Sequence, residues 1–283
     1  MKKYMSLVLF AHSIFALPFA IIGFFLAVNT TAYQFNWTLF LLMLVCMVTA
    51  RNAAMAFNRY LDRDIDALNP RTANRDIPAG KISANQALWF TILNCIAFMV
   101  ACYFLNFLCF VLSPIALFVI LFYSYVKRIS ALCHIVLGIG LGLAPVGAYL
   151  AVTGAFNIVP IFFGLAVVTW VSGFDIIYAL QDEEFDRKNK LNSIPVFFGI
   201  KKAILLSKSL HLLSFIFILL PVLYIPTGLF YYIGVVFYGL LLIYQHRLVS
   251  PTDFNKIDRG FMTTNGIASV VFAVFYLLNI WFI

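Results

Sequence analysis

The chain has 283 residues, of which 64% are hydrophobic and 11% charged, and its mean hydropathy is +0.99. Soluble domains carry roughly a quarter of their residues as charged side chains, so this composition excludes a soluble protein and indicates an integral membrane protein. The net charge of +8 comes from 19 Lys and Arg against 11 Asp and Glu. In so apolar a chain, this charge reflects membrane topology and anionic lipid, and a nucleic-acid partner is not expected.

Nine apolar segments of about 20 residues follow one another, each long enough to cross a ~30 Å hydrocarbon layer as a helix. They lie near residues 6–28, 38–60, 85–105, 107–126, 131–152, 158–180, 203–224, 229–247 and 261–282. The sequence therefore predicts an all-α membrane protein, a single polytopic domain over residues 1–283 with nine transmembrane helices around a central cavity. The division between the third and fourth segments depends on the short polar signal at Leu105 and Asn106.

The distribution of charge supports this count. Four alternate connections contain no Lys, Arg, Asp or Glu, namely Asn29–Trp37, Leu105–Asn106, Thr153–Asn157 and Ile225–Gly228. All Lys and Arg fall in the N-terminal segment, the other connections or the adjoining helix ends. By the positive-inside rule, these charged parts lie on the cytoplasmic side. We expect an inner-membrane protein with a cytoplasmic N-terminus and an external C-terminus. The first segment lacks a clear cleavage site and is expected to be a mature helix.

Two of the apolar segments carry polar side chains, which are costly in a membrane and are functional candidates by default. The second segment has Arg51, Asn58 and Asp62, and the sixth has Asp175, Asp182 and Asp186. Both sets have the spacing i, i+7, i+11, which places the three positions within roughly 40° of one another on a helix. Each segment thus presents one polar stripe running inward from its cytoplasmic end.

The two sets also match each other at a constant offset of 124 residues, from 51 to 175, 58 to 182 and 62 to 186. This offset predicts two parallel four-helix repeats, about 1–128 and 129–247, followed by an extra helix at 259–283. In that arrangement the two acidic helices face each other across the cavity.

Facing carboxylates require cations, and Mg²⁺ suits them because it binds carboxylate oxygens and completes its shell with water and substrate phosphates. The candidate metal ligands are Asn58, Asp62, Asp66, Asp182 and Asp186. The alternative is an acidic helix end that is solvated and paired with neighbouring arginines. Two matching sets favour a magnesium-held diphosphate.

Basic side chains flank the same face. Tyr123 and Lys127 are spaced i, i+4 at the end of the fourth segment, and Arg71 and Arg75 follow the first acidic set. These cations can orient diphosphate oxygens, although the positive-inside bias alone also accounts for Arg71 and Arg75. Arg51 lies ~10 Å deeper than Asn58 along the helix and needs an anion there. That anion is either Asp175 or a substrate carboxylate, which a guanidinium binds bidentately.

The sequence Asn58-Arg-Tyr-Leu-Asp62-Arg-Asp-Ile-Asp66 with Asn69-Pro-Arg-Thr-Ala-Asn-Arg75 resembles the first signature of the UbiA superfamily of intramembrane prenyltransferases. Asp175-Ile-Ile-Tyr178-Ala-Leu-Gln-Asp182-Glu-Glu-Phe-Asp186 resembles its second signature. The resemblance extends along the whole chain and is strongest to the 4-hydroxybenzoate polyprenyltransferase branch. Both signatures are long and specific.

The resemblance implies Mg²⁺-dependent transfer of a polyprenyl group from its diphosphate to a small carboxylated aromatic, such as 4-hydroxybenzoate, in ubiquinone biosynthesis. A dihydroxynaphthoate, as in menaquinone biosynthesis, or a haem or lipid acceptor remains an alternative. By position, the Asn and Asp residues of the signatures hold metal and diphosphate. Tyr123 and Lys127 contact the diphosphate, and Arg51 binds the acceptor carboxylate. Asp175 is a candidate for activating the phenol, and Tyr178 is a further substrate-binding candidate.

A secondary transporter is the rival from another class, since transporters also have repeats and intramembrane acids. The acids here collect at the cytoplasmic helix ends, which favours an enzyme, and no protein partner is implied.

The five cysteines lie in apolar segments without CxxC spacing, so neither disulfides nor zinc is expected. We expect packing roles for three histidines, an interhelical hydrogen bond from Asn265, and close helix contacts at three glycines. These are His12, His134 and His211, and Gly138, Gly140 and Gly142.

Overall fold

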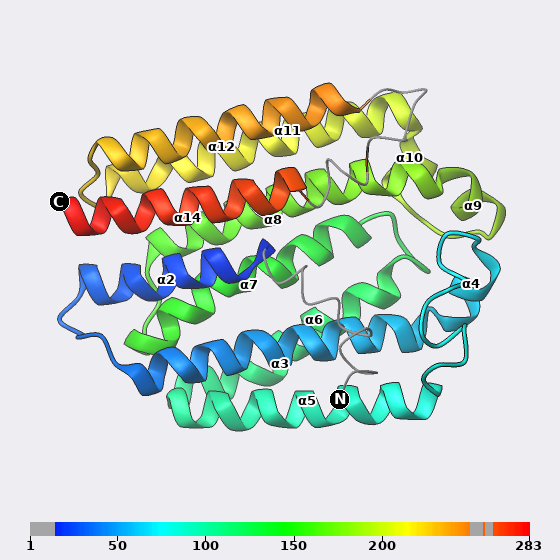
Figure 1. Cartoon of the computed structure of the whole chain (residues 1–283), viewed down its shortest axis with the longest axis horizontal. Helices are drawn as coiled ribbons and strands as arrows, with labels where there is room; N and C mark the ends of the chain where they lie inside the picture. The colour runs from blue at the N-terminus through cyan, green and yellow to red at the C-terminus, as the bar shows by residue number, and fades with distance from the viewer. Residues whose placement is uncertain (1–14, 250–256, 258–262) are drawn as a thin grey trace.

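The computed structural model describes residues 15–249, 257 and 263–283, and every regular element within these ranges is a helix (Figure 1). Eight spans in this part of the chain are long and apolar enough to cross a membrane. The long helices and the shorter α2 are α2 (Leu17–Thr30), α3 (Trp37–Leu61), α5 (Ala84–Leu105), α6 (Phe107–Val126), α7 (Cys133–Thr153), α8 (Ile158–Ala179), α11 (Ile200–Leu219), α12 (Leu229–Leu248) and α14 (Asn265–Phe282). The short ones are α4 (Arg63–Leu68), η2 (Leu180–Asp182), α9 (Glu183–Lys188), α10 (Ile194–Phe198) and η3 (Leu220–Leu223).

The nine predicted segments therefore correspond to eight spans and the apolar helix α2. The first nine residues of the first predicted segment, 6–14, and the start of the ninth lie outside the described residues, as does His12. The two sets of four helices, α2–α6 and α7–α12 without the short ones, follow the order that the repeat requires. The repeat itself stays a prediction.

Asparagine caps begin the helices that follow three of the four uncharged connections, and Gly228 precedes α12 after the fourth. Asn36 accepts from the backbone N–H of Thr38 at 2.8 Å, Asn106 from Cys109 at 2.9 Å, and Asn157 from Val159 at 2.9 Å. A neutral side chain satisfies the free N–H groups of a helix start without adding charge beside the hydrocarbon layer. Asn106 has extended backbone (φ −167°, ψ 168°), so the predicted division between the third and fourth segments is confirmed.

Close contacts between helices depend on residues without a side chain. A Cβ on Gly23 of α2 would lie 2.1 Å from the Pro145 oxygen of α7. A Cβ on Gly138 would lie 2.5 Å from the Ser172 Oγ, so α7 approaches α8 closely there. Gly142 faces α8 in the same way, whereas a Cβ on Gly140 would have its nearest neighbour at 3.9 Å. The expected close packing is therefore confirmed at Gly138 and Gly142 but not at Gly140.

The largest buried cluster is aromatic and joins α2, α8, α12 and α14. Its fully buried rings are Phe19, Phe24, Phe163, Trp170, Tyr231, Tyr238, Phe272 and Tyr276. Within it, Trp170 Nε1 donates to Asn265 Oδ1 at 3.1 Å, which confirms the expected interhelical bond from Asn265. A polar pair of this kind inside the bundle fixes the register of α8 against α14.

Large apolar side chains also point outward. On α5, Trp89, Leu93, Ile96 and Val100 are all exposed, and α6 and α11 show similar outer faces. Apolar surface of this extent would be unstable in water but matches the acyl chains of a bilayer. The chain is thus a multi-pass membrane protein whose outer helix faces meet lipid.

In each acidic segment the helix is interrupted, and both interruptions lie at the same end of the bundle. α3 ends at Leu61, Asp62 is the cap, and α4 continues from Arg63; α8 ends at Ala179, and a 3₁₀ turn leads into α9. Each predicted polar stripe therefore crosses an interruption in its helix. Figure 1 shows α4 and α9 together at one end, opposite the C-terminus.

Candidate active site

The first acidic set lies where α3 passes into α4. Asn58 is in the last turn of α3 and donates from Nδ2 to Asp62 Oδ2 at 3.0 Å. Asp66 follows on α4 and is only 5% exposed. Asp62 lies between α3 and α4, where the helix is interrupted. The relative positions of these three side chains therefore depend on the backbone at Asp62 as well as on helical spacing.

The second acidic set lies where α8 passes into α9. Asp182 ends the 3₁₀ turn and is buried, and Asp186 on α9 has no exposed surface. Buried carboxylates are costly unless they are paired or bind a metal. Both are paired here, and their partners come from other parts of the chain.

The loop after α4 carries the partners of Asp182. Arg71 Nε donates to Asp182 Oδ1 at 3.1 Å, and a second guanidinium nitrogen bonds the other carboxylate oxygen. Asn69 Nδ2 donates to the same Asp182 Oδ1 at 3.3 Å. Arg71 Nη1 also donates to Tyr178 Oη at 2.5 Å, with the guanidinium 4.9 Å above the Tyr178 ring. Asn69 and Arg71 of the first signature thus bind Asp182 of the second signature.

Two consecutive cations after α6 connect the remaining acids of the two sets. Lys127 Nζ lies 2.8 Å from Asp186 Oδ1, and Arg128 Nη1 donates to Asp62 Oδ1 at 3.0 Å. Because Lys127 and Arg128 are neighbours in the chain, Asp62 and Asp186 must lie close to the same short segment. The structure therefore brings the two acidic sets together on one side of the bundle.

The fourth pair is local. Arg75 Nη1 lies 2.7 Å from Asp66 Oδ1, within the first signature. All four carboxylates considered as metal ligands thus have one basic partner each. Burial raises the pKa of Asp62 to about 6, although the nearby Arg128 opposes this. For Lys127, burial lowers the pKa, but the Asp186 carboxylate outweighs it and the net pKa is raised.

The oxygen donors suit Mg²⁺ in kind. Within the described ranges, no three His, Cys, Asp or Glu side chains are grouped so as to hold an ion while the basic partners remain in place. The Oδ2 atoms of Asp66 and Asp186 are nevertheless buried and have no hydrogen-bond partner among the residues that the structure describes. These orphaned carboxylate oxygens fit a cation that would bind as the basic side chains turn to an anionic substrate.

Arg51 lies deeper on α3, as expected, but it does not pair with Asp175. Its Nε is buried and has no hydrogen-bond partner among the described residues. Tyr123 of α6 is half-buried and interacts electrostatically with Arg51 and Asp62, so it lies between the depth of the arginine and that of the acids. Asp175 instead accepts from His134 across the α7–α8 contact, with 2.7 Å between Oδ2 and Nδ1. The ion-pair alternative for Arg51 is therefore wrong.

The sequence reasoning missed Arg128 and His134. Arg128 stands beside the predicted Lys127 in the same basic dipeptide, and its position next to the helix end was the available signal. His134 was expected only to pack, and its 41-residue separation from Asp175 gives no local pattern that would reveal the pair.

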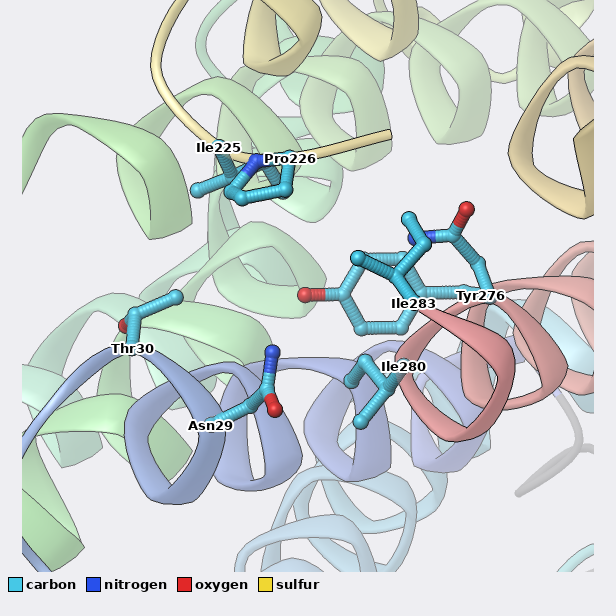
Figure 2. A pocket seen from close by; sticks show the side chains of 8 residues that line it. Asn29, Thr30, Ile225, Pro226, Tyr276, Ile280 and Ile283 are labelled. Atoms are coloured by element: carbon cyan, nitrogen blue, oxygen red, sulfur yellow. The ribbon is translucent and has the colours of Figure 1, made fainter. Parts of the chain in front are cut away.

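A pocket lies at the opposite end of the bundle (Figure 2). Its walls include Asn29 and Thr30 of α2, the Ile225–Pro226 loop, and Tyr276 of α14. The pocket contains no Asp, Glu, Lys or Arg. It is therefore separate from the acidic and basic cluster and lacks the groups that a diphosphate requires.

The family model of the UbiA prenyltransferase family matches residues 16–281. A 4-hydroxybenzoate octaprenyltransferase from Francisella tularensis subsp. novicida (strain U112) is 29% identical over 231 residues, 80% of this chain and 79% of the relative. Another 4-hydroxybenzoate octaprenyltransferase, from Tolumonas auensis (strain DSM 9187 / NBRC 110442 / TA 4), is 29% identical over 84% of this chain and 83% of the relative.

Solved structures share the fold. The apo structure of a UbiA homologue from Aeropyrum pernix K1 has a TM-score of 0.84 and 30% identity, covering 94% of this chain and 97% of that one. A UbiA homologue from Archaeoglobus fulgidus bound to GPP and Mg²⁺ has a TM-score of 0.73 at 22% identity, with 99% of both chains covered.

Proposed function

This chain belongs to the UbiA prenyltransferase family and is an aromatic prenyltransferase, and we propose that it transfers a polyprenyl group from polyprenyl diphosphate to 4-hydroxybenzoate in ubiquinone biosynthesis. The names of the relatives support this acceptor. A dihydroxynaphthoate of menaquinone biosynthesis is the second candidate, because it also offers a carboxylate to Arg51. The transporter alternative is set aside, since the family consists of enzymes.

The observation that carries the proposal is that the acids of both sets are paired with basic side chains from other segments of the chain. Arg71 from the first signature bonds Asp182 of the second, and Lys127 and Arg128 bind Asp186 and Asp62. Together with Arg75 and Asp66, these pairs concentrate four acids and four cations at one end of the bundle. Such a mixed cluster can bind a metal through its acids and a diphosphate through its bases.

When substrate binds, the acidic side chains would hold the metal and the basic side chains would bind the diphosphate. Asn58, Asp62, Asp66, Asp182 and Asp186 would hold Mg²⁺, which when bound neutralises diphosphate charge and makes it a better leaving group. The bound GPP and Mg²⁺ of the Archaeoglobus relative support this assignment. Lys127, Arg71 and Arg75, with Tyr123 and Tyr178, would then donate to the diphosphate oxygens.

In this assignment, the basic side chains bind the carboxylates before substrate arrives and the diphosphate afterwards. Charge-assisted bonds to diphosphate replace their bonds to the carboxylates, so few buried charges are left without partners at any stage. Breaking the allylic C–O bond leaves the diphosphate with its electrons and a delocalised carbocation. The surrounding apolar helices keep water away from this cation.

The acceptor would bind deeper than the diphosphate. Arg51 offers a guanidinium whose Nε has no partner in residues 15–249, 257 and 263–283, and a carboxylate can bind this guanidinium bidentately. The ring carbon ortho to the hydroxyl then forms the new C–C bond with the allylic carbon. Asp175 is proposed to accept the phenol proton before the C–C bond forms. The ring C–H proton then passes to water, its bonding electrons restore aromaticity, and the ring oxygen takes its proton back from Asp175. The polyprenyl chain would extend between helices into lipid.

We place this site on the cytoplasmic side of the inner membrane, with the C-terminus outside. The charge bias of the connections supports that orientation.

The test is a reaction of the purified protein in detergent with Mg²⁺, a polyprenyl diphosphate and a panel of acceptors, analysed by mass spectrometry. The panel contains 4-hydroxybenzoate, 1,4-dihydroxy-2-naphthoate, haem and a prenyl-accepting glycerol phosphate. We expect ring-prenylated 4-hydroxybenzoate. Product from haem or the glycerol phosphate alone would refute the proposal, and product only from the naphthoate would support the second acceptor.

A further inference from the structure

The Asp175 carboxylate is held by a histidine whose tautomer is set by a third element. Asp175 Oδ2 lies 2.7 Å from His134 Nδ1, and His134 Nε2 lies 3.3 Å from the backbone nitrogen of Ile194. A backbone N–H can only donate, so Nε2 must present its lone pair. This contact places the ring proton on Nδ1, from which His134 donates to Asp175.

His134 is well placed to fix this geometry. It is 3% exposed, so the surrounding helices restrict its ring. Ser172 Oγ donates to the His134 backbone carbonyl oxygen at 3.1 Å, which joins α8 to α7 through the backbone and not through the ring. Ile194 is the first residue of α10, so the N–H that it offers is one of the free groups at a helix start. Three elements, α7, α8 and α10, thus meet at one ring.

The ring also connects Asp175 to the acidic cluster. The Asn192 N–H, two residues before Ile194, donates to the Lys127 carbonyl oxygen at 2.8 Å. Lys127 in turn lies 2.8 Å from Asp186, which is on α9, the helix that precedes the same loop. The loop of residues 189–193 therefore connects α9, which carries a proposed metal ligand, to the backbone group that orients His134.

Asp175 itself is incompletely satisfied. Its side chain is 24% exposed, compared with 4% for that of His134, and His134 is its only hydrogen-bond partner in the part of the chain that the structure describes. Here one oxygen is anchored and Oδ1 stays available, as a proton acceptor requires.

We propose that His134 is a positioning residue, which rests on the proposed function: by donating from Nδ1 it anchors Oδ2 of Asp175 and leaves Oδ1 to accept the proton of the acceptor phenol. The Ile194 N–H maintains the required tautomer. In the reaction, the phenol O–H bond breaks, its electron pair stays on the oxygen, and the proton forms an O–H bond with Oδ1.

The test compares His134→Leu, which removes the donor, with His134→Asn, whose amide N–H can replace Nδ1–H. Ser172→Ala is the matched control, because it deletes an α7–α8 hydrogen bond without touching Asp175. We expect His134→Leu to lower kcat on the order of 10²-fold, the scale of a misplaced catalytic group, with an unchanged KM for polyprenyl diphosphate. His134→Asn should recover at least tenfold, and Ser172→Ala should match wild type.

A double-mutant cycle with Asp175→Asn adds a second criterion. If His134 acts through Asp175, His134→Leu should cost little further activity in the Asp175→Asn background. Independent losses, no recovery in His134→Asn, or an equal loss in Ser172→Ala would overturn the proposal and identify a packing role.

A measurement without turnover separates this inference from the proposed function. ¹⁵N NMR of histidine-labelled protein should show His134 as a neutral ring protonated at Nδ1. A ring protonated at Nε2 would overturn the positioning geometry even in an active enzyme. Wild-type protein that prenylates no aromatic acid would instead refute the proposed function, and with it the catalytic use of the pair, whatever the tautomer.

Discussion

Replacing Arg51 by alanine should weaken binding of the aromatic acid far more than binding of the polyprenyl diphosphate. The Arg51 Nε is buried and has no partner within the described part of the chain, so the enzyme has already removed this group from water before the acid arrives. A carboxylate that binds it regains charge-assisted hydrogen bonds. Each such bond contributes about 1.5–3 kcal/mol.

The expected loss follows from these values. Taking one to two bonds, less the cost of desolvating the carboxylate, gives about 2–3 kcal/mol, or roughly 30- to 150-fold in the dissociation constant. Arg51→Lys should fall between wild type and alanine, because an ammonium keeps the charge but not the planar pair of donors. Lys201→Ala, which removes an exposed charge from the start of α11, is the charge-matched control and should have no effect.

The assay is equilibrium binding of 4-hydroxybenzoate and of 4-hydroxybenzamide to detergent-solubilised protein in the presence of Mg²⁺ and an unreactive prenyl thiolodiphosphate. Wild type should prefer the acid over the amide by about the same 30- to 150-fold. Arg51→Ala should bind both almost equally. If Arg51→Ala kept the full preference for the acid, the carboxylate would bind elsewhere and the assignment of Arg51 would be wrong.

Three further outcomes are expected. Asp62→Asn and Asp182→Asn should each abolish product formation in the mass-spectrometric assay while keeping a folded yield in size-exclusion chromatography; residual turnover above a few per cent in either would contradict a shared site. EDTA should stop the reaction and Mg²⁺ should restore it, and activity that persists after thorough chelation would refute metal dependence. Gly23→Leu should lower the melting temperature, because its Cβ would lie 2.1 Å from the Pro145 oxygen, whereas Gly147→Ala, with nothing within 4 Å, should not.

Much of the fold could be predicted because hydrophobicity and charge act over each segment separately. The charge-free connections identified which helix ends lie together, and the lone Asn106 correctly marked a helix start because its side chain caps α6. The helix break between Ala179 and Glu183 could not be predicted by periodicity, since helical spacing assumes that the helix continues.

The residues of the candidate site could be nominated from the sequence, but the contacts between them could not. Tyr178 and Asp182 lie on α8 and the turn after it, and their partner Arg71 comes from a loop more than 100 residues earlier. Loop conformation decides that contact, and residue spacing carries no information about it. The same holds for His134 and Asp175, which meet only because Gly138 lets α7 approach α8.

The convergence of both acidic sets on one metal–diphosphate group is tested most directly with Mn²⁺ in place of Mg²⁺. Electron paramagnetic resonance can measure Mn²⁺ bound in the presence of the prenyl thiolodiphosphate to wild type, Asp62→Asn and Asp182→Asn. We predict that wild type binds Mn²⁺ together with the analogue, and that each variant loses this binding. Undiminished Mn²⁺ and analogue binding in either variant would contradict the convergence of the two sets on a single site.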